Sequence, residues 1–307
     1  MATIAEMQVD PKKLHDLVER AKALLGDHYA TLEKRRQKGA KDPHRLVELI
    51  ARAEEMIGKL NAGGFELTGE YAVTLSELDA MVPLIEEAAT IPGFEDGRIA
   101  TTANYLHTAV MLSARAFLLG IASAQAATFV PRAGSPTPDM NVIGDGGGQV
   151  EIEVYTPQRL CHPIIPTLTE TDAEEIVAAA FRRKKEQLAT GDSILLIGGF
   201  GCDGVSIDRL KAASENRLAP GNRRPNLAAI AFYVIASWAR FGGDPEAPEA
   251  EGVNAGAHTG LVLNPDYKGT LQLRPLEDLP SESSSARLVP NLAQPRTYFL
   301  ATDYAVV

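Results

Sequence analysis

The chain has 307 residues, of which 45% are hydrophobic and 23% charged, and its formal net charge is −10. This composition is that of a globular protein with a substantial core, and it excludes fibrous and low-complexity proteins. The acidic balance speaks against a protein that coats nucleic acid without sequence preference, although a basic groove can lie on an acidic body. Two cysteines, Cys161 and Cys202, imply no disulfide framework and fit a reducing cytoplasm.

The first ninety residues are expected to be helical. Apolar residues recur three and four positions apart in two runs, the first beginning near Pro11 and the second spanning residues 46–60. A third helix is predicted over Ser76–Thr90. We interpret this region as an arm for oligomerisation or for docking a partner protein. A basic cluster between the first two helices either contacts phosphate or forms a solvated helix end; it consists of Lys34, Arg35, Arg36, Lys38 and Lys41.

The N-terminal segment lacks a basic head followed by an apolar core, so we expect no signal peptide. The longest apolar stretch, residues 105–130, contains Arg115 and Gln125. Because an arginine is costly inside a membrane, this stretch favours a buried helix over Leu112–Ala127 and no membrane association.

The middle of the chain predicts a hairpin followed by alternating helices and strands. Strands over Met140–Ile143 and Val150–Tyr155 flank the glycine-rich residues 144–148, which are typical of a hairpin turn. A helix is predicted over Thr171–Ala189, with Thr171 as its N-cap and Glu174 completing a capping box. The remaining predicted elements are strands Ser193–Ile197, Asn226–Ile235, Leu261–Leu263, Leu271–Leu273 and Tyr298–Ala301, a helix Ser206–Ala213 and a flexible loop Pro245–Glu251.

Two glutamates share one face of the predicted strand Val150–Tyr155. Glu151, Glu153 and Tyr155 point to one side, because successive side chains of a strand alternate. The glutamates would repel each other unless water, a basic side chain or a divalent cation relieved the repulsion. The hairpin would bring Asp139 beside Glu153, and two such carboxylates form a hard-oxygen site of the kind that holds Mg²⁺.

These residues resemble the PD-(D/E)XK (restriction-endonuclease-like) nuclease superfamily. The similarity covers residues 99–235: a helix, Thr137-Pro138-Asp139, a glycine turn, the strand Val150–Tyr155, a helix and an apolar strand. The resemblance implies a mixed α/β (α+β) core of order α-β-β-β-α-β and hydrolysis of DNA phosphodiesters with Mg²⁺ or Mn²⁺. It implies that Asp139, Glu153 and the carbonyl group of Val154 hold the metal, with Glu151 assisting.

The chain departs from the superfamily pattern at two points. Tyr155 stands where the superfamily has a lysine, and a phenol cannot supply that positive charge. The preceding helix also lacks the carboxylate that often completes the site. Lys184 lies on the apolar stripe of the following helix, where it either replaces the missing lysine or lets its ammonium reach solvent along the sheet. Gln187 borders the same stripe and either contacts phosphate or caps a strand edge.

Three rival sites are weaker. Residues 199–204 match a dinucleotide-binding glycine fingerprint, but no acidic residue follows the next strand to bind a ribose. Cys161 and His162 are adjacent and therefore point apart in an extended chain, so we do not expect them to form a catalytic pair. The cysteines and histidines have no zinc-binding spacing. His28, His44 and His107 are interpreted as surface or packing residues.

The sequence therefore predicts a helical region over residues 1–95 and a nuclease-like domain over residues 96–307. The favoured function is a cytoplasmic, metal-dependent nuclease with Asp139, Glu153 and Lys184 in its active site. The alternative is the same fold without catalysis, acting as a nucleic-acid-binding or assembly subunit. Tyr155 and the net charge favour the alternative, whereas Asp139 and Glu153 favour the enzyme.

Overall fold

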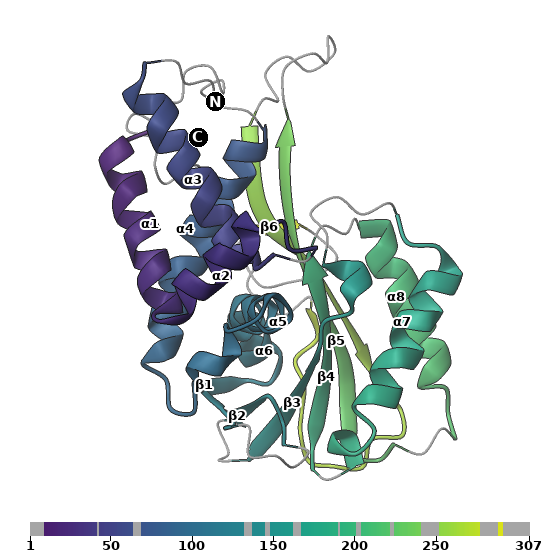
Figure 1. Cartoon of the computed structure of the whole chain (residues 1–307). Helices are drawn as coiled ribbons and strands as arrows, with labels where there is room; N and C mark the ends of the chain where they lie inside the picture. Colours follow the sequence, from purple (N-terminus) through teal and green to yellow (C-terminus); the bar gives the residue numbers. More distant parts are fainter. Residues whose placement is uncertain are drawn as a thin grey trace.

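A seven-stranded mixed sheet forms the centre of the protein (Figure 1). The strands lie in sequence order: β1 (Ala124–Phe129), β2 (Met140–Gly144), β3 (Gln149–Tyr155), β4 (Ser193–Phe200), β5 (Leu227–Arg240), β6 (Gly252–Leu263) and β7 (Leu288–Pro290). The first three are antiparallel, β3, β4 and β5 are parallel, and the last two are again antiparallel. The computed structural model describes residues 9–41, 43–63, 69–131, 137–144, 148–161, 167–189, 191–200, 204–221, 224–240, 252–276 and 288–290.

Helices cover both faces of the sheet. One face carries α1 (Pro11–Leu25), α3 (Arg45–Asn61), α4 (Gly69–Ala89), α5 (Thr102–Ser113) and α6 (Arg115–Ile121), and the other carries α7 (Glu170–Arg183) and α8 (Gly204–Arg217). Each face has its own hydrophobic core, because side chains alternate along the central strands. The predicted α/β class is confirmed at this level.

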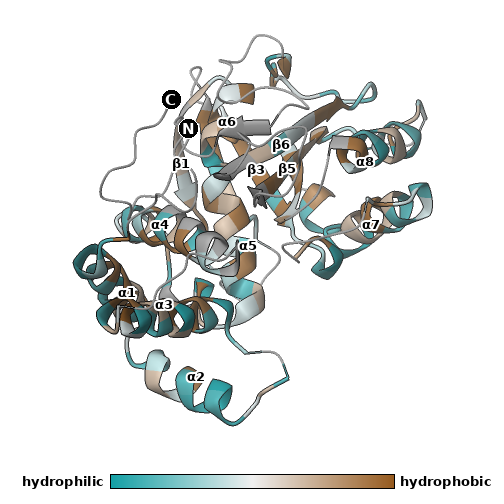
Figure 2. Cartoon of the chain, turned by 90° about the horizontal axis from the view of Figure 1, so that it is seen from above, coloured by the Kyte–Doolittle hydropathy of each residue, from teal (hydrophilic) through white to brown (hydrophobic). Residues whose placement is uncertain are grey.

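The helical region shares a core with the sheet. Buried side chains run without a break from Leu14 of α1 through Leu49 of α3 to Ile194 of β4. The sequence pattern did not distinguish the short helix α2 (His28–Gln37) from the helix that precedes it. Helix α2 has no buried residue. It lies at the edge of the molecule and is largely hydrophilic (Figure 2). The predicted division at residue 95 stays a prediction.

Several predicted elements differ from the structure. The helix expected over Leu112–Ala127 ends at Ile121, and residues 124–129 form β1, which pairs with β2. Sheet pairing therefore overrides the helical preference of its alanines. Leu271–Leu273 is not a strand. Tyr298–Ala301 and Pro245–Glu251 lie outside the described residues.

Helix α7 begins two residues earlier than predicted. Thr169 is its N-cap: its hydroxyl accepts from the backbone N–H of Asp172, whose carboxylate accepts from the N–H of Thr169. The expected pair, Thr171 and Glu174, lies inside the helix. Both spacings satisfy the capping-box pattern, so the tertiary position of the helix decides between them. The helix ends at Arg183, and residues 187–189 form a separate short 3-10 helix.

The predicted strand Ser193–Ile197 and helix Ser206–Ala213 are confirmed, each as part of a longer element. The predicted strand Asn226–Ile235 is confirmed from Leu227 on and continues to Arg240. No helix in the described parts of the chain combines the length and apolar character needed to span a membrane.

Candidate functional site

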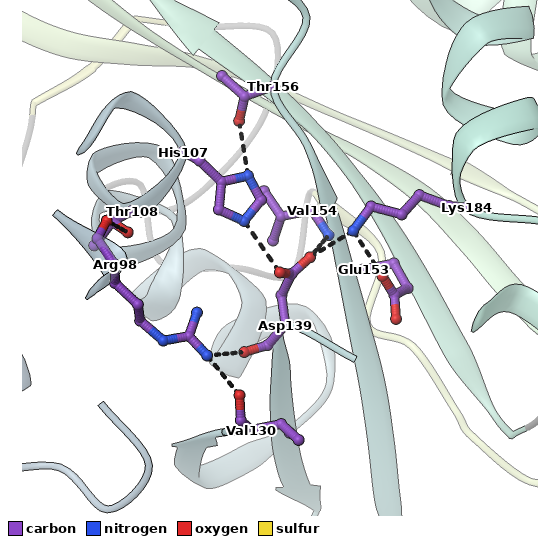
Figure 3. Close-up of polar contacts among 9 residues, drawn as sticks. All are labelled: Arg98, His107, Thr108, Val130, Asp139, Glu153, Val154, Thr156 and Lys184. Atoms are coloured by element: carbon purple, nitrogen blue, oxygen red, sulfur yellow. Dashed lines mark hydrogen bonds and ion pairs between the residues drawn. The ribbon is translucent and has the colours of Figure 1, made fainter. Parts of the chain in front are cut away.

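The predicted hairpin brings Asp139 to the end of β3. The backbone N–H of Asp139 donates to the carbonyl oxygen of Ile152 at 3.1 Å, immediately before β2 begins. Its carboxylate oxygen Oδ2 accepts from the backbone N–H of Val154 at 2.9 Å. Asp139 is therefore held by two hydrogen bonds to β3, which is the strand that also carries Glu153 (Figure 3). This juxtaposition confirms the expectation from the glycine turn.

Lys184 joins the two carboxylates. Its ammonium nitrogen lies 2.8 Å from Oδ2 of Asp139 and 2.9 Å from Oε2 of Glu153. The residue is the C-cap of α7, which packs across the face of the sheet opposite α5. Its side chain is 16% exposed, so it lies at the floor of the site and does not extend into solvent. Of the two interpretations of Lys184, the structure matches the one that brings its charge to the carboxylates.

The two carboxylates differ in their proton affinity. Burial raises the pKa of Glu153 to about 7, and the charges of Asp139 and Glu151 add to this effect while Lys184 opposes it. Burial would also raise the pKa of Asp139, but hydrogen bonds and charges from His107 and Lys184 outweigh it and hold that pKa far below its usual range. Asp139 is thus the permanent anion of the pair.

One oxygen of the site is left without a partner. Glu153 is fully buried, and its Oε1 atom forms no hydrogen bond with any described residue. A buried carboxylate oxygen in this state is costly unless a cation or a proton satisfies it.

His107 belongs to the site, so its interpretation as a surface or packing residue is wrong. Its Nε2 atom lies 3.1 Å from Oδ1 of Asp139, and its Nδ1 atom lies 3.5 Å from the hydroxyl of Thr156. The helix α5 carries it toward the end of β3 (Figure 3). His28 is exposed and His44 is buried, as expected.

Arg98 was also missed. It is completely buried, and its guanidinium donates to the carbonyl oxygen of Val130 at 2.6 Å and, at 3.5 Å, to that of Asp139. The guanidinium also lies 5.4 Å from the ring centroid of Phe129. Arg98 therefore links the backbone at Val130 to the backbone at Asp139. Nothing in the local sequence distinguishes it from a surface arginine.

The remaining predicted residues lie around this centre. Tyr155 is buried, and the guanidinium of Arg183 lies 5.6 Å from its ring centroid. Glu151 lies at the far side of Glu153 along β3, where its carboxylate packs close to Gly191. Gln187 lines the same cavity as Asp139 and Lys184.

The oxygen atoms at this point suit a hard divalent cation. In a β-strand the N–H and C=O groups of one residue point to the same side, so the carbonyl of Val154 faces the side of Asp139. Asp139, Glu153 and this carbonyl thus provide the oxygen ligands that Mg²⁺ and Mn²⁺ take. No group of three acidic, histidine or cysteine side chains with metal-binding geometry occurs among the described residues.

The site opens into a cavity of about 1260 Å³. It is lined by residues from α2, the segment leading to α3, the start of α5, the end of β3 and α7. Asp139 and Lys184 line the cavity beside three further cationic side chains: Arg35, Arg159 and Arg183.

The structure does not support the dinucleotide site or the cysteine nucleophile considered from the sequence. A side chain at Gly199 would meet the carbonyl oxygen of Leu160 at 2.3 Å, so close packing explains this glycine without a dinucleotide. Residues 201–203 of that fingerprint and His162 lie outside the described residues. Burial raises the pKa of Cys161 to about 11, which keeps its thiol protonated and weakly nucleophilic.

Comparison of the chain with known protein families, characterised proteins and solved structures finds no match.

Proposed function

We propose that this protein is a metal-dependent nuclease that hydrolyses DNA phosphodiester bonds, with a divergent restriction-endonuclease-like core. The observation that carries the proposal is the position of Lys184, whose ammonium contacts both Asp139 and Glu153. Lys184, at the end of α7, would supply the positive charge beside the carboxylates that the superfamily takes from a lysine at the position of Tyr155. The order of α6, the antiparallel β1, β2 and β3, then α7 and the parallel β4 supports the same assignment.

Asp139, Glu153 and the carbonyl of Val154 would hold Mg²⁺ or Mn²⁺. The ion, when bound, would stabilise negative charge on a phosphoryl oxygen and make a bound water more acidic. Asp139 is suited to hold a cation because it stays ionised. Glu153 offers its unpartnered Oε1, and binding a cation would offset the cost of burying that charge.

Lys184 would place positive charge next to the attacked phosphate. The two carboxylates raise its pKa, so its ammonium stays protonated at neutral pH. A fixed cation in a partly buried site stabilises charge that develops in the transition state more strongly than a solvated one does. His107 holds the second oxygen of Asp139 and so fixes the direction of its carboxylate.

The test is cleavage of supercoiled and linear DNA by the purified protein with Mg²⁺, Mn²⁺ or EDTA. We expect metal-dependent cleavage that Asp139→Ala, Glu153→Gln and Lys184→Ala each reduce by at least about 100-fold. The matched controls are the exposed neighbours Lys185→Ala and Glu186→Gln, which should retain activity. Thermal unfolding of each variant would show that the loss does not come from misfolding.

A second candidate is the same fold acting without catalysis as a nucleic-acid-binding or assembly subunit. It is favoured by the fact that Lys184 already pairs with both carboxylates, so its charge partly neutralises theirs without a metal. Cleavage that is absent, or that survives Asp139→Ala, would establish this candidate and contradict the nuclease. Under either function we place the protein in the cytoplasm, as its two cysteines suggest.

A further inference from the structure

The cavity beside the site has a charge opposite to that of the whole molecule. Its described lining includes four cationic side chains and two carboxylates, Asp139 and Glu175, whereas the chain carries a net charge of −10. A concave surface of one sign focuses the local field and attracts ligands of the other sign. The cavity is therefore suited to a polyanion.

Two of these cations come from different helices and are available to a ligand. Arg35 is an exposed residue of α2, and Arg183 is the exposed last residue of α7. Neither forms an ion pair with a described residue. Arg159, in contrast, pairs with Asp172 at 2.8 Å. The two guanidinium groups belong to residues almost 150 positions apart in the sequence, and only the fold brings both to this cavity.

The lining also offers surfaces for bases. The guanidinium of Arg183 covers the ring of Tyr155, and a guanidinium plane is a stacking surface for a base as well as a partner for phosphate. Pro43, Pro138 and Pro157 line the same space and add apolar area between the charges. Single-stranded nucleic acid is bound by this combination of cationic and stacking groups.

The size of the cavity suits a strand of a few nucleotides. Its volume is about 1260 Å³. Pockets of about 300–1,000 Å³ enclose one ligand of the size of a nucleotide. The cavity thus has room for one strand of a few nucleotides beside Asp139 and Lys184.

We propose that this cavity takes a single DNA strand, with α2 and α7 contacting the strand from its two sides. The inference rests on the proposed function in taking DNA as the substrate, and it restricts that substrate to single-stranded or frayed ends. It also gives the N-terminal helices a role in the site itself, as one wall of the substrate channel.

The test measures binding without cleavage. Fluorescence anisotropy in EDTA would compare a labelled single strand of about ten nucleotides with the matching duplex, over a range of salt concentrations. We expect the single strand to bind at least about tenfold more tightly than the duplex. Arg35→Ala and Arg183→Ala should each weaken binding of the single strand and lower the slope of log affinity against log salt by about 1.

The neighbouring residues provide controls with the same change of charge. Arg36 pairs with Glu33 at 2.7 Å and does not line the cavity, and Arg182 is exposed and also lies outside it. Arg36→Ala and Arg182→Ala should therefore leave the affinity nearly unchanged. Equal effects of all four substitutions would show a diffuse charge effect and overturn the proposal, as would equal or tighter binding of the duplex.

The outcomes separate this inference from the proposed function. Single-strand binding that depends on Arg35 and Arg183, without any metal-dependent cleavage, would support the channel and contradict the nuclease. Metal-dependent cleavage of duplex DNA that Arg35→Ala leaves unaffected would support the nuclease and overturn the channel.

Discussion

At the scale of single residues, the site depends on how Asp139 is held. Its two carboxylate oxygens contact His107 on one side and both Val154 and Lys184 on the other. Its backbone carbonyl lies near the buried guanidinium of Arg98. Such contacts fix the direction in which a carboxylate presents its oxygens, and under the proposed function they would govern its affinity for the metal.

The contact of His107 with Asp139 leads to a direct prediction. His107→Ala should raise the metal concentration needed for half-maximal cleavage by about 10- to 100-fold, because the carboxylate loses one of its fixed partners. His28→Ala, on the exposed helix α2, is the control with the same change of side chain. A metal titration of cleavage that is unchanged in His107→Ala would contradict this role.

The raised pKa of Glu153 predicts a pH-dependent stability. Between its ordinary value of 4.5 and about 7, the folded protein binds a proton that the unfolded chain has released. The unfolding free energy should therefore fall as the pH rises through this window, by about 1–3 kcal/mol. Glu153→Gln removes this dependence because the amide does not ionise.

Urea unfolding in EDTA at about pH 5 and about pH 8 would measure the effect. The wild type should lose stability relative to Glu153→Gln over this range, while Glu186→Gln should follow the wild type. Parallel curves for the wild type and Glu153→Gln would show that Glu153 has an ordinary pKa.

At the scale of elements, helix α7 carries Lys184 into the site and Arg183 to its edge. Its start is fixed by the reciprocal bonds between Thr169 and Asp172. Its end is fixed at Arg183, so that Lys184 leaves the helix where its ammonium reaches the end of β3. The length and start of this helix therefore decide where the cation lies.

Two substitutions compare the observed N-cap of α7, Thr169, with the N-cap expected from the sequence, Thr171. Thr169→Ala should lower the unfolding free energy by about 1 kcal/mol, since it leaves a backbone N–H at the start of the helix without its acceptor. Thr171→Ala should have little effect, because Thr171 is exposed within the first turns of the helix. Urea unfolding of the two variants would distinguish them. The reverse order would contradict the observed cap.

At the scale of the whole molecule, one contact between the helical layer and the sheet is especially close. A side-chain carbon at Gly198 of β4 would lie 2.2 Å from a methyl group of Val110 in α5. The absence of a side chain thus lets α5 approach the sheet and bring His107 to Asp139. The helical layer and the site are coupled through this packing.

We expect Gly198→Ala to destabilise the protein by about 1–3 kcal/mol through overpacking. Gly58→Ala, inside α3, meets no atom within 4 Å and should stabilise the protein by about 0.5–1 kcal/mol. Denaturant unfolding would measure both changes. A neutral Gly198→Ala would show that α5 can move away from β4 at little cost.

The parts of the site that could be predicted are those set by local patterns. The glycine turn and the alternation of β3 place Asp139 beside Glu153, because a hairpin of this length has few registers. Helical periodicity likewise places Lys184 on the side of its helix that faces the sheet. The nuclease interpretation is based on these three residues, and the nuclease activity of the protein stays a prediction.

Other features depend on contacts between distant segments, and only the tertiary structure decided them. His107 and Arg98 have no distinctive local pattern, because their contacts come from residues about 30 positions away. Arg35 belongs to a basic cluster in the sequence, but only the fold places it at the cavity with Arg183. The stretch before Phe129 becomes a strand because β2 offers it a partner. Local sequence determines which elements form most readily, whereas packing against the rest of the chain decides where they end and which side chains meet.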